Sequence, residues 1–380
     1  MQNLSPSSKF GDLPSMGHDG QRRIQRLRSA FDQQGLTALY LVDLANIRYL
    51  TGFTGSFARL VVPLKDQEIT LITDGRYVEQ ASSELADQGL GDAYRILPVS
   101  ERDSILQSLL GGTGHLGAEG HAITWDELEG LSSTIGPGRI ERVENATLKL
   151  RATKDNFELG LLAHAAVIAD AALSRVLPLL GQSPTEREFA RSLEAAMFDE
   201  GATAISFPTI IASGPRSSLP HGQPTERRLV PGDVVVVDFG AEYLGYHSDC
   251  TRTFSIGEPS DEVTHAYQAV SSAQRQGVEA SVTGASISQV DRLVRSVLDE
   301  AGLVDRFIHG LGHGVGLEIH ELPMISSNEV QVLSQNQVIT IEPGVYLPNA
   351  FGIRIEDSLI VRDGEPLVIT KAPKDWVIAI

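Results

Sequence analysis

Residues 233–240 read DVVVVDFG, an apolar run interrupted by one acid, Asp238, and followed by a glycine. Such a run is typical of a β-strand, and a second strand-like stretch at residues 246–256 follows after a short turn. Together the two stretches predict a β-hairpin. Asp238 carries a charge into an apolar strand, where an unpaired carboxylate is costly to bury.

The order of elements around this hairpin occurs twice in the chain. Thr185 and Glu188 have the spacing of a capping box, which predicts the start of a helix. The two halves share almost no sequence identity, so the repeat is one of architecture. Each half is expected to have two helices followed by two strands: residues 156–180, 185–199, 233–240 and 246–256 in the first half, and about 262–282, about 287–301, 338–346 and 352–361 in the second.

The first hairpin carries two acids at matching distances from its turn. Asp238 and Asp249 are equidistant from a midpoint between Tyr243 and Leu244. Residues equidistant from a hairpin turn face each other across the ladder, with Cβ atoms about 4.5–5.5 Å apart, unless a bulge shifts the register. The sequence therefore predicts two like charges in direct opposition.

The second hairpin repeats the arrangement with Glu342 and Glu356, whose midpoint is Asn349. Like charges in opposition destabilise a hairpin that has no counter-charge. Four carboxylates that converge on one interior point need cations, and a pair of divalent metal ions meets that need. The alternative interpretation places these acids on solvated faces or beside arginines.

A histidine-rich segment supplies a fifth candidate ligand. Residues 307–317 read FIHGLGHGVGL, in which His309 and His313 have the spacing of a zincin helix. The segment lacks the glutamate of that motif, has too many glycines for a stable helix and does not fit the GxGxxG dinucleotide motif. The glycines are expected to let the backbone pass close to a metal or substrate, with His313 as the ligand.

The N-terminal third predicts a separate α/β domain. A helix is expected at residues 21–34 and strands at 38–42, 60–63 and 69–73, and the charged stretch at 148–156 is the expected boundary. The predicted organisation is a flexible tail, a first domain and a second domain: residues 1–20, 21–150 and 151–380.

Composition restricts the class of partner. The 31 Lys and Arg against 49 Asp and Glu leave a net charge of −18, which argues against nucleic acid and against an anionic membrane surface. A single cysteine, Cys250, excludes an intramolecular disulfide and a cysteine-based zinc cluster. No run is expected to span a membrane and residues 1–21 have no signal-peptide core, so the predicted location is the cytoplasm.

The five candidate ligands occur in the order of a known signature. They resemble the metal-binding set of the pita-bread metallopeptidases, family M24, which includes methionine aminopeptidases, aminopeptidase P and prolidase. Residues 43–58, DLANIRYLTGFTGSFA, look like the N-terminal domain of aminopeptidase P, prolidase and creatinase, which methionine aminopeptidases lack. The resemblance rests on five motifs: VVVVDFG at 234–240, SDCTRTF at 248–254, GLGHGVGLEIHE at 310–321, IEPGVY at 341–346 and GIRIED at 352–357.

The resemblance implies roles for further residues. His221 is similar to the family histidine beside the reacting peptide, which assists proton transfer or substrate binding, and His309 is similar to one lining the substrate pocket. His320 resembles the histidine that stabilises the tetrahedral intermediate. Glu342 resembles the glutamate that carries a proton from the attacking water to the proline nitrogen, and Arg354 the arginine that supports the active-site network.

The fold implied by the resemblance has two parts, an N-terminal creatinase/prolidase-like α/β domain and a C-terminal pseudo-twofold pita-bread α+β domain. The implied cofactors are two divalent metal ions, with Mn(II) expected and Co(II) or Zn(II) as alternatives. The implied substrates are peptides with proline at the second position, and relatives with this N-terminal domain imply a homodimer.

Two activities of this family remain open from the sequence. Residues 210–222, IIASGPRSSLPHG, look more like bacterial aminopeptidases P than like prolidases. The expected activity is therefore that of an Xaa-Pro aminopeptidase, with an Xaa-Pro dipeptidase as the alternative. A non-catalytic binding protein on the same fold is the third reading.

Overall fold

The computed structural model describes residues 17–144 and 146–379. Between Arg151 and Ala152 the chain divides into two compact units. The tail predicted at residues 1–20 falls largely outside the described residues. Helix α2 already begins at Gly20, where the Asp19 side chain accepts a hydrogen bond from the Arg22 amide.

The N-terminal unit contains a six-stranded mixed sheet in the order β4-β3-β2-β1-β5-β6. The three strands predicted there are present as β1, β2 and β3. Tyr40 of β1 packs with Leu106 and Leu131 in one core, so α5 and α6 cover the sheet on that side. The elements are α2 (Gly20–Phe31), β1 (Ala38–Leu41), α3 (Leu44–Thr51), β2 (Arg59–Pro63), β3 (Ile69–Thr73), α4 (Val78–Asp87), η1 (Gly91–Ala93), β4 (Tyr94–Pro98), η2 (Val99–Glu101), α5 (Arg102–Leu110), β5 (Leu116–Glu119), α6 (Trp125–Ile135), β6 (Ile140–Val143) and α7 (Ala146–Ala152).

The first half of the C-terminal unit has the predicted two helices and hairpin. The predicted capping box is confirmed, because the Thr185 side chain accepts from the Glu188 amide while the Glu188 carboxylate accepts from the Thr185 amide. The elements are α8 (Asn156–Val176), η3 (Leu177–Gln182), α9 (Glu186–Asp199), β7 (Ala204–Ile205), β8 (Ile210–Ser213), η4 (Gly214–Ser218), β9 (Val234–Phe239), β10 (Ala241–Tyr243), β11 (Tyr246–His247) and β12 (Cys250–Ile256).

The second half repeats that order. Its two long predicted strands are each interrupted, and the interruptions fall at Glu342 and Glu356, where the backbone leaves the ladder. The elements are α10 (Asp261–Ala280), α11 (Ile287–Glu300), η5 (Val304–Arg306), β13 (Gly312–Gly314), β14 (Glu321–Ile325), β15 (Val338–Ile341), β16 (Gly344–Leu347), β17 (Phe351–Arg354), β18 (Asp357–Ile360), β19 (Leu367–Val368) and β20 (Val377–Ile378).

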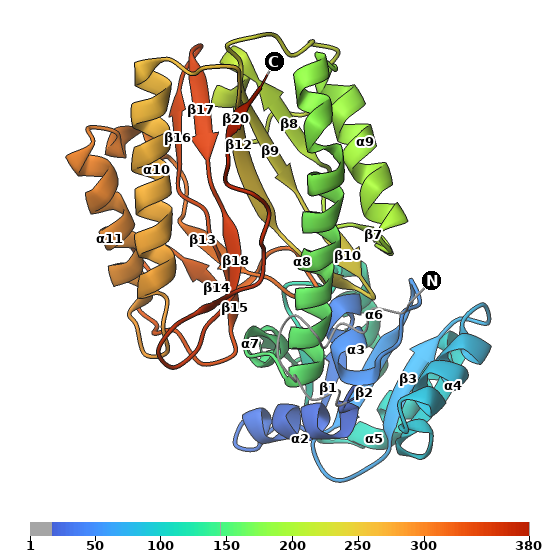
Figure 1. The fold of residues 1–380 in the computed structure, drawn as a ribbon. Helices are drawn as coiled ribbons and strands as arrows, with labels where there is room; N and C mark the ends of the chain where they lie inside the picture. Colours follow the sequence, from blue (N-terminus) through green and yellow to red (C-terminus); the bar gives the residue numbers. More distant parts are fainter. Residues whose placement is uncertain (1–16, 145, 380) are drawn as a thin grey trace. The chain divides into compact units, whose positions relative to one another are not determined.

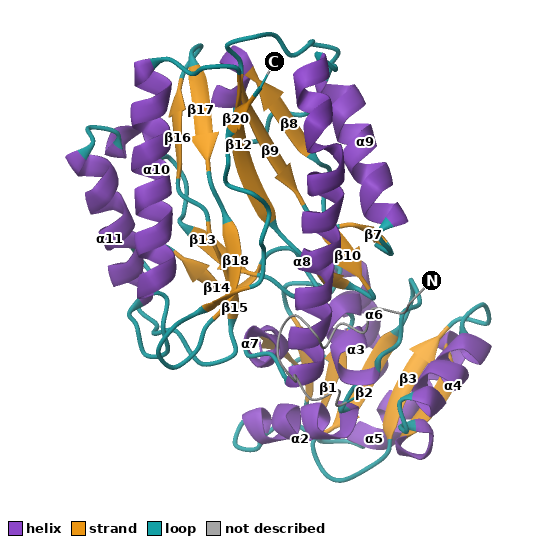
Figure 2. Cartoon of the chain, in the orientation of Figure 1, coloured by secondary structure: helices purple, strands orange, loops and turns teal. Residues whose placement is uncertain are grey.

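The strands of the C-terminal unit lie between two pairs of helices, α8 and α9 on one side and α10 and α11 on the other (Figures 1 and 2). Val235, Val237 and Phe239 of β9 belong to the core beneath α8 and α9. Because side chains alternate along a strand, Asp238 points to the opposite face, away from those helices. The fold thus directs this acid toward the interior between the two halves.

The segment Asn156–Gln182 bears on the expectation that no run of the sequence spans a membrane. By length and composition it is apolar enough to cross a membrane, and it is the one such helix among the described residues. However, 67% of its most apolar window is buried inside the protein, and Leu173 and Val176 pack in the core with α9. We therefore interpret it as a core helix.

The register of the first hairpin differs from the prediction. Asp238 pairs with Thr251, so Asp249 is displaced by two residues from direct opposition. The turn is formed by Leu244 and Gly245, whose φ angles are +49° and +85°. A shift of two residues keeps both acids on the same face of the ladder, because the side-chain period of a strand is two.

The register of the second hairpin is the predicted one. β15 pairs with β18, and β16 pairs with β17, in one continuous register centred on Asn349. This register places Glu342 opposite Glu356. Asn349 has a φ of +60°, a left-handed conformation that asparagine adopts more readily than most residues.

Candidate metal centre and active site

The predicted site residues line one cavity of about 570 Å³ in the C-terminal unit. The structure brings all nine of them together from β9, β13, β17 and the segments between the other strands. The nine are His221, Asp238, Asp249, His309, His313, His320, Glu342, Arg354 and Glu356.

His313 reaches the cavity because glycines flank it on β13. A Cβ on Gly312 would lie 2.1 Å from the Thr340 carbonyl oxygen, and one on Gly314 would lie 2.2 Å from the Leu322 carbonyl oxygen. The sequence interpretation was that these glycines let the backbone approach a metal or substrate. Gly312 lines the cavity, as that interpretation requires, and both glycines also let β13 fit between β14 and β15, which places the imidazole among the acids.

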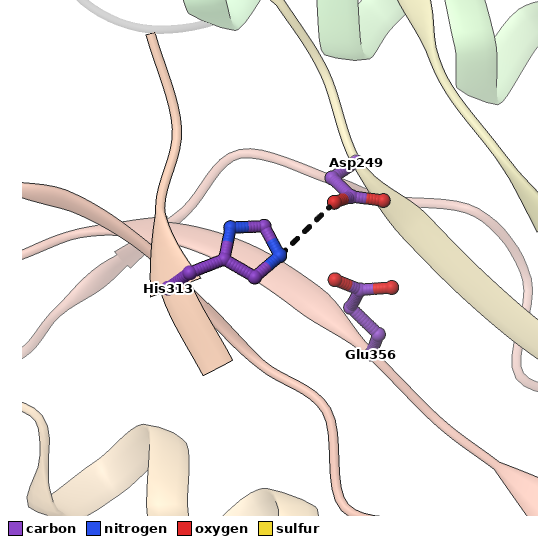
Figure 3. Close-up of side chains that lie close together, drawn as sticks. All are labelled: Asp249, His313 and Glu356. Atoms are coloured by element: carbon purple, nitrogen blue, oxygen red, sulfur yellow. Dashed lines mark ion pairs between the residues drawn. The ribbon is translucent and has the colours of Figure 1, made fainter. Parts of the chain in front are cut away.

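Three of the five candidate ligands form a compact group (Figure 3). One ligand atom from each of Asp249, His313 and Glu356 lies within 4.8 Å of the others. His313 Nε2 lies 3.5 Å from Asp249 Oδ2 and 3.4 Å from Glu342 Oε1. Its Nδ1 lies 3.0 Å from the Gly314 carbonyl oxygen, so that nitrogen carries the proton and Nε2 has its lone pair toward the acids.

The protonation of His313 also suits a ligand. Burial lowers the pKa of His313 to about 4, so the ring is neutral near pH 7. Neutral imidazole is the form that binds metal ions.

Two carboxylates each present one fixed oxygen and one oxygen without a partner. Asp238 Oδ2 accepts a hydrogen bond from Arg354 Nη2 at 2.6 Å, and Glu356 Oε2 accepts from Thr251 Oγ1 at 2.7 Å. Within the described residues, the remaining buried oxygens, Asp238 Oδ1 and Glu356 Oε1, have no hydrogen-bond partner. Buried carboxylate oxygens in this state are suited to hold a cation, so the donor set fits divalent metal ions.

The acids also repel one another. Burial raises the pKa of Asp249, and the charges of Glu356, Asp238 and Glu342 raise it further. Burial and the charges of Glu342 and Asp238 also raise the pKa of Glu356. Burial raises the pKa of Glu342 to about 7. Divalent cations would stabilise the charged form of all four carboxylates.

Arg354 connects the acids to a residue that the sequence reasoning missed, Tyr346. Arg354 Nη1 donates to the Tyr346 hydroxyl at 2.7 Å, and His309 Nε2 lies 3.0 Å from the same oxygen. Tyr346 lies four residues after Glu342, and the alternation of side chains in this hairpin was the signal that could have found it. Burial lowers the pKa of His309 to about 4, which leaves this ring neutral.

His320 and His221 lie at the cavity surface. The rings of His320 and His313 meet edge to face, with centroids 4.4 Å apart. Burial is the main cause that lowers the pKa of His320. His221 lies in a turn at residues 219–222, which the Gly222 amide closes with a hydrogen bond to the Leu219 carbonyl.

A buried ion pair fixes the segment that carries His320. Lys154 Nζ lies 3.1 Å from Glu321 Oε2, and the two side chains are 1% and 2% exposed. Glu321 Oε1 accepts from the Glu318 amide, so the carboxylate also holds the turn that precedes it. Breaking a buried pair by removing one partner costs about 3–5 kcal/mol. No local sequence pattern relates two residues 167 positions apart.

Two models of known protein families match the chain. A family model described as metallopeptidase family M24 matches residues 160–363, and one described as the creatinase/prolidase N-terminal domain matches residues 23–153. The chain belongs to metallopeptidase family M24. It is therefore a metallopeptidase, and the resemblance and two-part fold expected from the sequence are confirmed.

Relatives of this M24 peptidase match over nearly the whole chain. An Xaa-Pro dipeptidase from Pyrococcus furiosus is 33% identical over 355 residues, which cover 93% of this chain and 99% of the relative. The solved structure of an Xaa-Pro dipeptidase from Bacillus anthracis has 37% identity and a TM-score of 0.89, covering 95% of this chain and 100% of that one. An X-Pro aminopeptidase structure from Thermotoga maritima has 32% identity and a TM-score of 0.82, and the match covers 94% of this chain and 99% of that one.

Proposed function

We propose that this M24 peptidase is a dinuclear-metal Xaa-Pro dipeptidase. The observation that carries the proposal is a single cavity in which four carboxylates and the imidazole of His313 lie together, in a chain whose full-length relatives include Xaa-Pro dipeptidases. This choice reverses the preference drawn from residues 210–222, because similarity over the whole chain supports the dipeptidase better than one short segment supports the aminopeptidase.

The metal ligands proposed for this enzyme share the cavity and the donor chemistry described above: Asp238, Asp249, His313, Glu342 and Glu356. Bound divalent ions would acidify a water molecule and polarise the scissile carbonyl. Oxygen-rich donors with one imidazole favour Mn(II), with Co(II) and Zn(II) as alternatives. Arg354 holds Asp238 in place and offsets part of the negative charge of the acids.

The side chains of the cavity account for the remaining steps of hydrolysis. Glu342 accepts a proton from the attacking water and returns it to the proline nitrogen as the carbon–nitrogen bond breaks. His320 donates a hydrogen bond to the oxyanion that develops on the carbonyl. His221 and His309 contact the substrate, since both line the cavity.

The wall of the cavity suits a proline ring. Apolar side chains in the lining include Phe207, Pro208, Ile210, Ile319 and Met324. Proline has no amide hydrogen and a fixed ring, so an apolar wall can recognise it without a hydrogen-bond acceptor. Peptides with proline at the second position are the proposed substrates.

One observation favours the Xaa-Pro aminopeptidase as a second candidate. Of the described residues that line the cavity, Arg354 is the sole arginine or lysine. Its guanidinium already donates to Asp238, Tyr346 and the Pro220 carbonyl. A dipeptide places its carboxylate next to the proline, and no other cation of the described lining faces it.

Turnover of an Xaa-Pro dipeptide and of its extension Xaa-Pro-Gly tests the proposal after manganese reconstitution. A dipeptidase should cleave the dipeptide with a kcat/KM at least about tenfold higher. Preference for the tripeptide would establish the second candidate instead. Glu342→Gln should lower kcat by about 10²–10⁴-fold, whereas Glu365→Gln, at an exposed acid, should leave it unchanged.

The homodimer, the cytoplasmic location and the lack of a nucleic-acid partner stay predictions from the sequence. The net charge of −18 supports the last of these. Light scattering during size-exclusion chromatography measures the oligomeric state directly.

A further inference from the structure

The segment that presents His221 is fixed at both of its ends. This segment, here named the His221 loop, covers residues 213–225 and begins at the last residue of β8. Between its ends it passes through η4, and its Ser217 hydroxyl accepts a hydrogen bond from the Gly352 amide at 2.8 Å. The Pro220 carbonyl, next to His221, accepts from Arg354 Nη1 at 3.2 Å. The loop thus contacts the same arginine that holds Asp238.

One carboxylate, that of Glu186, binds the two ends of the His221 loop. Its Oε1 accepts from the Ser213 amide at 2.9 Å and from the Ser213 hydroxyl at 2.7 Å. Its Oε2 accepts from the Thr225 amide at 2.9 Å and from the Thr225 hydroxyl at 2.6 Å. Arg216 Nε, within the loop, lies 3.2 Å from Oε2. Each oxygen therefore holds one end of the loop.

Glu186 is itself held rigidly. It is the first residue of α9, directly after the Thr185 cap, and its amide donates to the Arg227 carbonyl at 2.9 Å. Its side chain has no exposed surface. Burial alone would raise the pKa of Glu186, but the hydrogen bonds from Thr225 and Ser213 outweigh burial and lower it. The carboxylate is charged at neutral pH, and the hydrogen bonds that it accepts within the described residues all come from the loop.

We propose that Glu186 is a positioning residue that sets the place of His221 over the cavity by holding both ends of the loop. This inference rests on the proposed role of His221 in substrate binding or proton transfer. A displacement of about 1 Å in a group that contacts the substrate can cost roughly 10²-fold in rate. Loss of the Glu186 charge should therefore lower activity although Glu186 lines no part of the cavity.

Glu186→Gln is the direct test, because glutamine has the same shape but presents an NH₂ group to hydrogen-bond donors. We expect kcat/KM on an Xaa-Pro substrate to fall about 10-fold to 100-fold. In metal-free protein, amide hydrogen exchange across residues 213–225 should become faster. Glu188→Gln is the matched control, since Glu188 lies in the same helical turn and contacts Thr185 rather than the loop. Glu188→Gln should change neither kcat/KM nor the amide hydrogen exchange of residues 213–225.

Thr225→Val provides a milder variant if Glu186→Gln fails to fold. It removes one of the two donors at the second end of the loop and should give a smaller change of the same sign in both measurements. If hydrogen exchange across residues 213–225 is unchanged in these variants, Glu186 does not hold the loop and the inference is wrong. This measurement does not depend on hydrolysis, so it separates a failure of the inference from a failure of the proposed function.

A double variant tests whether Glu186 acts through His221. If it does, Glu186→Gln should lower kcat/KM by much less in a His221→Ala background than in the wild type, because the two residues form one unit. Independent, multiplicative effects in the double variant would contradict a positioning role and leave Glu186 as a purely structural residue.

Discussion

At the scale of single residues, the acids of the site differ in which of their carboxylate oxygens accept hydrogen bonds. Glu356 is 2% exposed, with one oxygen bound by Thr251 and the other without a partner among the described residues. The negative charges of Glu342 and Asp238 raise the pKa of its carboxyl group. In the absence of metal ions this arrangement costs folding free energy, because buried like charges repel and lose hydration.

The substitution Glu356→Gln should therefore have opposite effects with and without metal. Without metal it removes one of four converging charges and keeps the hydrogen bond from Thr251 through the amide oxygen. We expect the free energy of unfolding of the metal-free protein to rise by about 1–2 kcal/mol. With MnCl₂ the wild type should gain stability and the variant should gain much less, because a ligand has been lost.

Thermal unfolding in EDTA and in MnCl₂ measures both effects on the Glu356→Gln variant. Glu365→Gln is the control, as an exposed acid outside the cavity. A lower melting temperature of the metal-free variant would show that Glu356 stabilises the fold without a cation. That outcome would contradict the proposed metal centre.

At the scale of elements, the helices and hairpins predicted from the sequence are present in the structure. The predicted register of the first hairpin is wrong. The capping box at Thr185 marks the start of α9, and Gly302, with a φ of +72°, follows the end of α11, so local chemistry that a sequence displays directly marks these helix ends. The register of the first hairpin depends on where its two-residue turn lies. That turn has Leu244 in a left-handed conformation, which a leucine gives no reason to expect.

The left-handed conformation of Leu244 in this turn leads to a prediction about stability. Leu244 has a φ of +49° and is 50% exposed, so its side chain contributes little packing to offset the backbone strain. Asparagine adopts this conformation at lower cost. Leu244→Asn should raise the free energy of unfolding by about 0.5–1 kcal/mol. Leu219→Asn is the control, because Leu219 is 49% exposed but has a φ of −98°. Denaturant titration should show no gain for this control.

At the scale of the whole molecule, the sequence motifs point to the proposed ligands but not to the residues that hold them in place. The four acids and His313 lie in motifs with strong local character, and the structure places all of them in one cavity. The residues that fix the loops, Lys154 and Glu186, contact partners far along the chain and have no local signature. Long-range contacts of this kind depend on the packed fold, so sequence spacing cannot reveal them.

The proposed ligands all belong to the unit that begins at Ala152. Metal binding should therefore slow amide hydrogen exchange in that unit and not in the N-terminal one. A ligand stabilises the part of the structure that binds it, so addition of MnCl₂ to metal-free protein should slow amide exchange in β9, β12, β13 and β15 to β18. Exchange in β1, β2 and β3 of the N-terminal unit should not change. Hydrogen exchange followed by mass spectrometry resolves these segments, with Asp249→Asn as the variant that should lose the protection. Equal protection of both units, or protection that persists in this variant, would mean that manganese binds elsewhere in the chain.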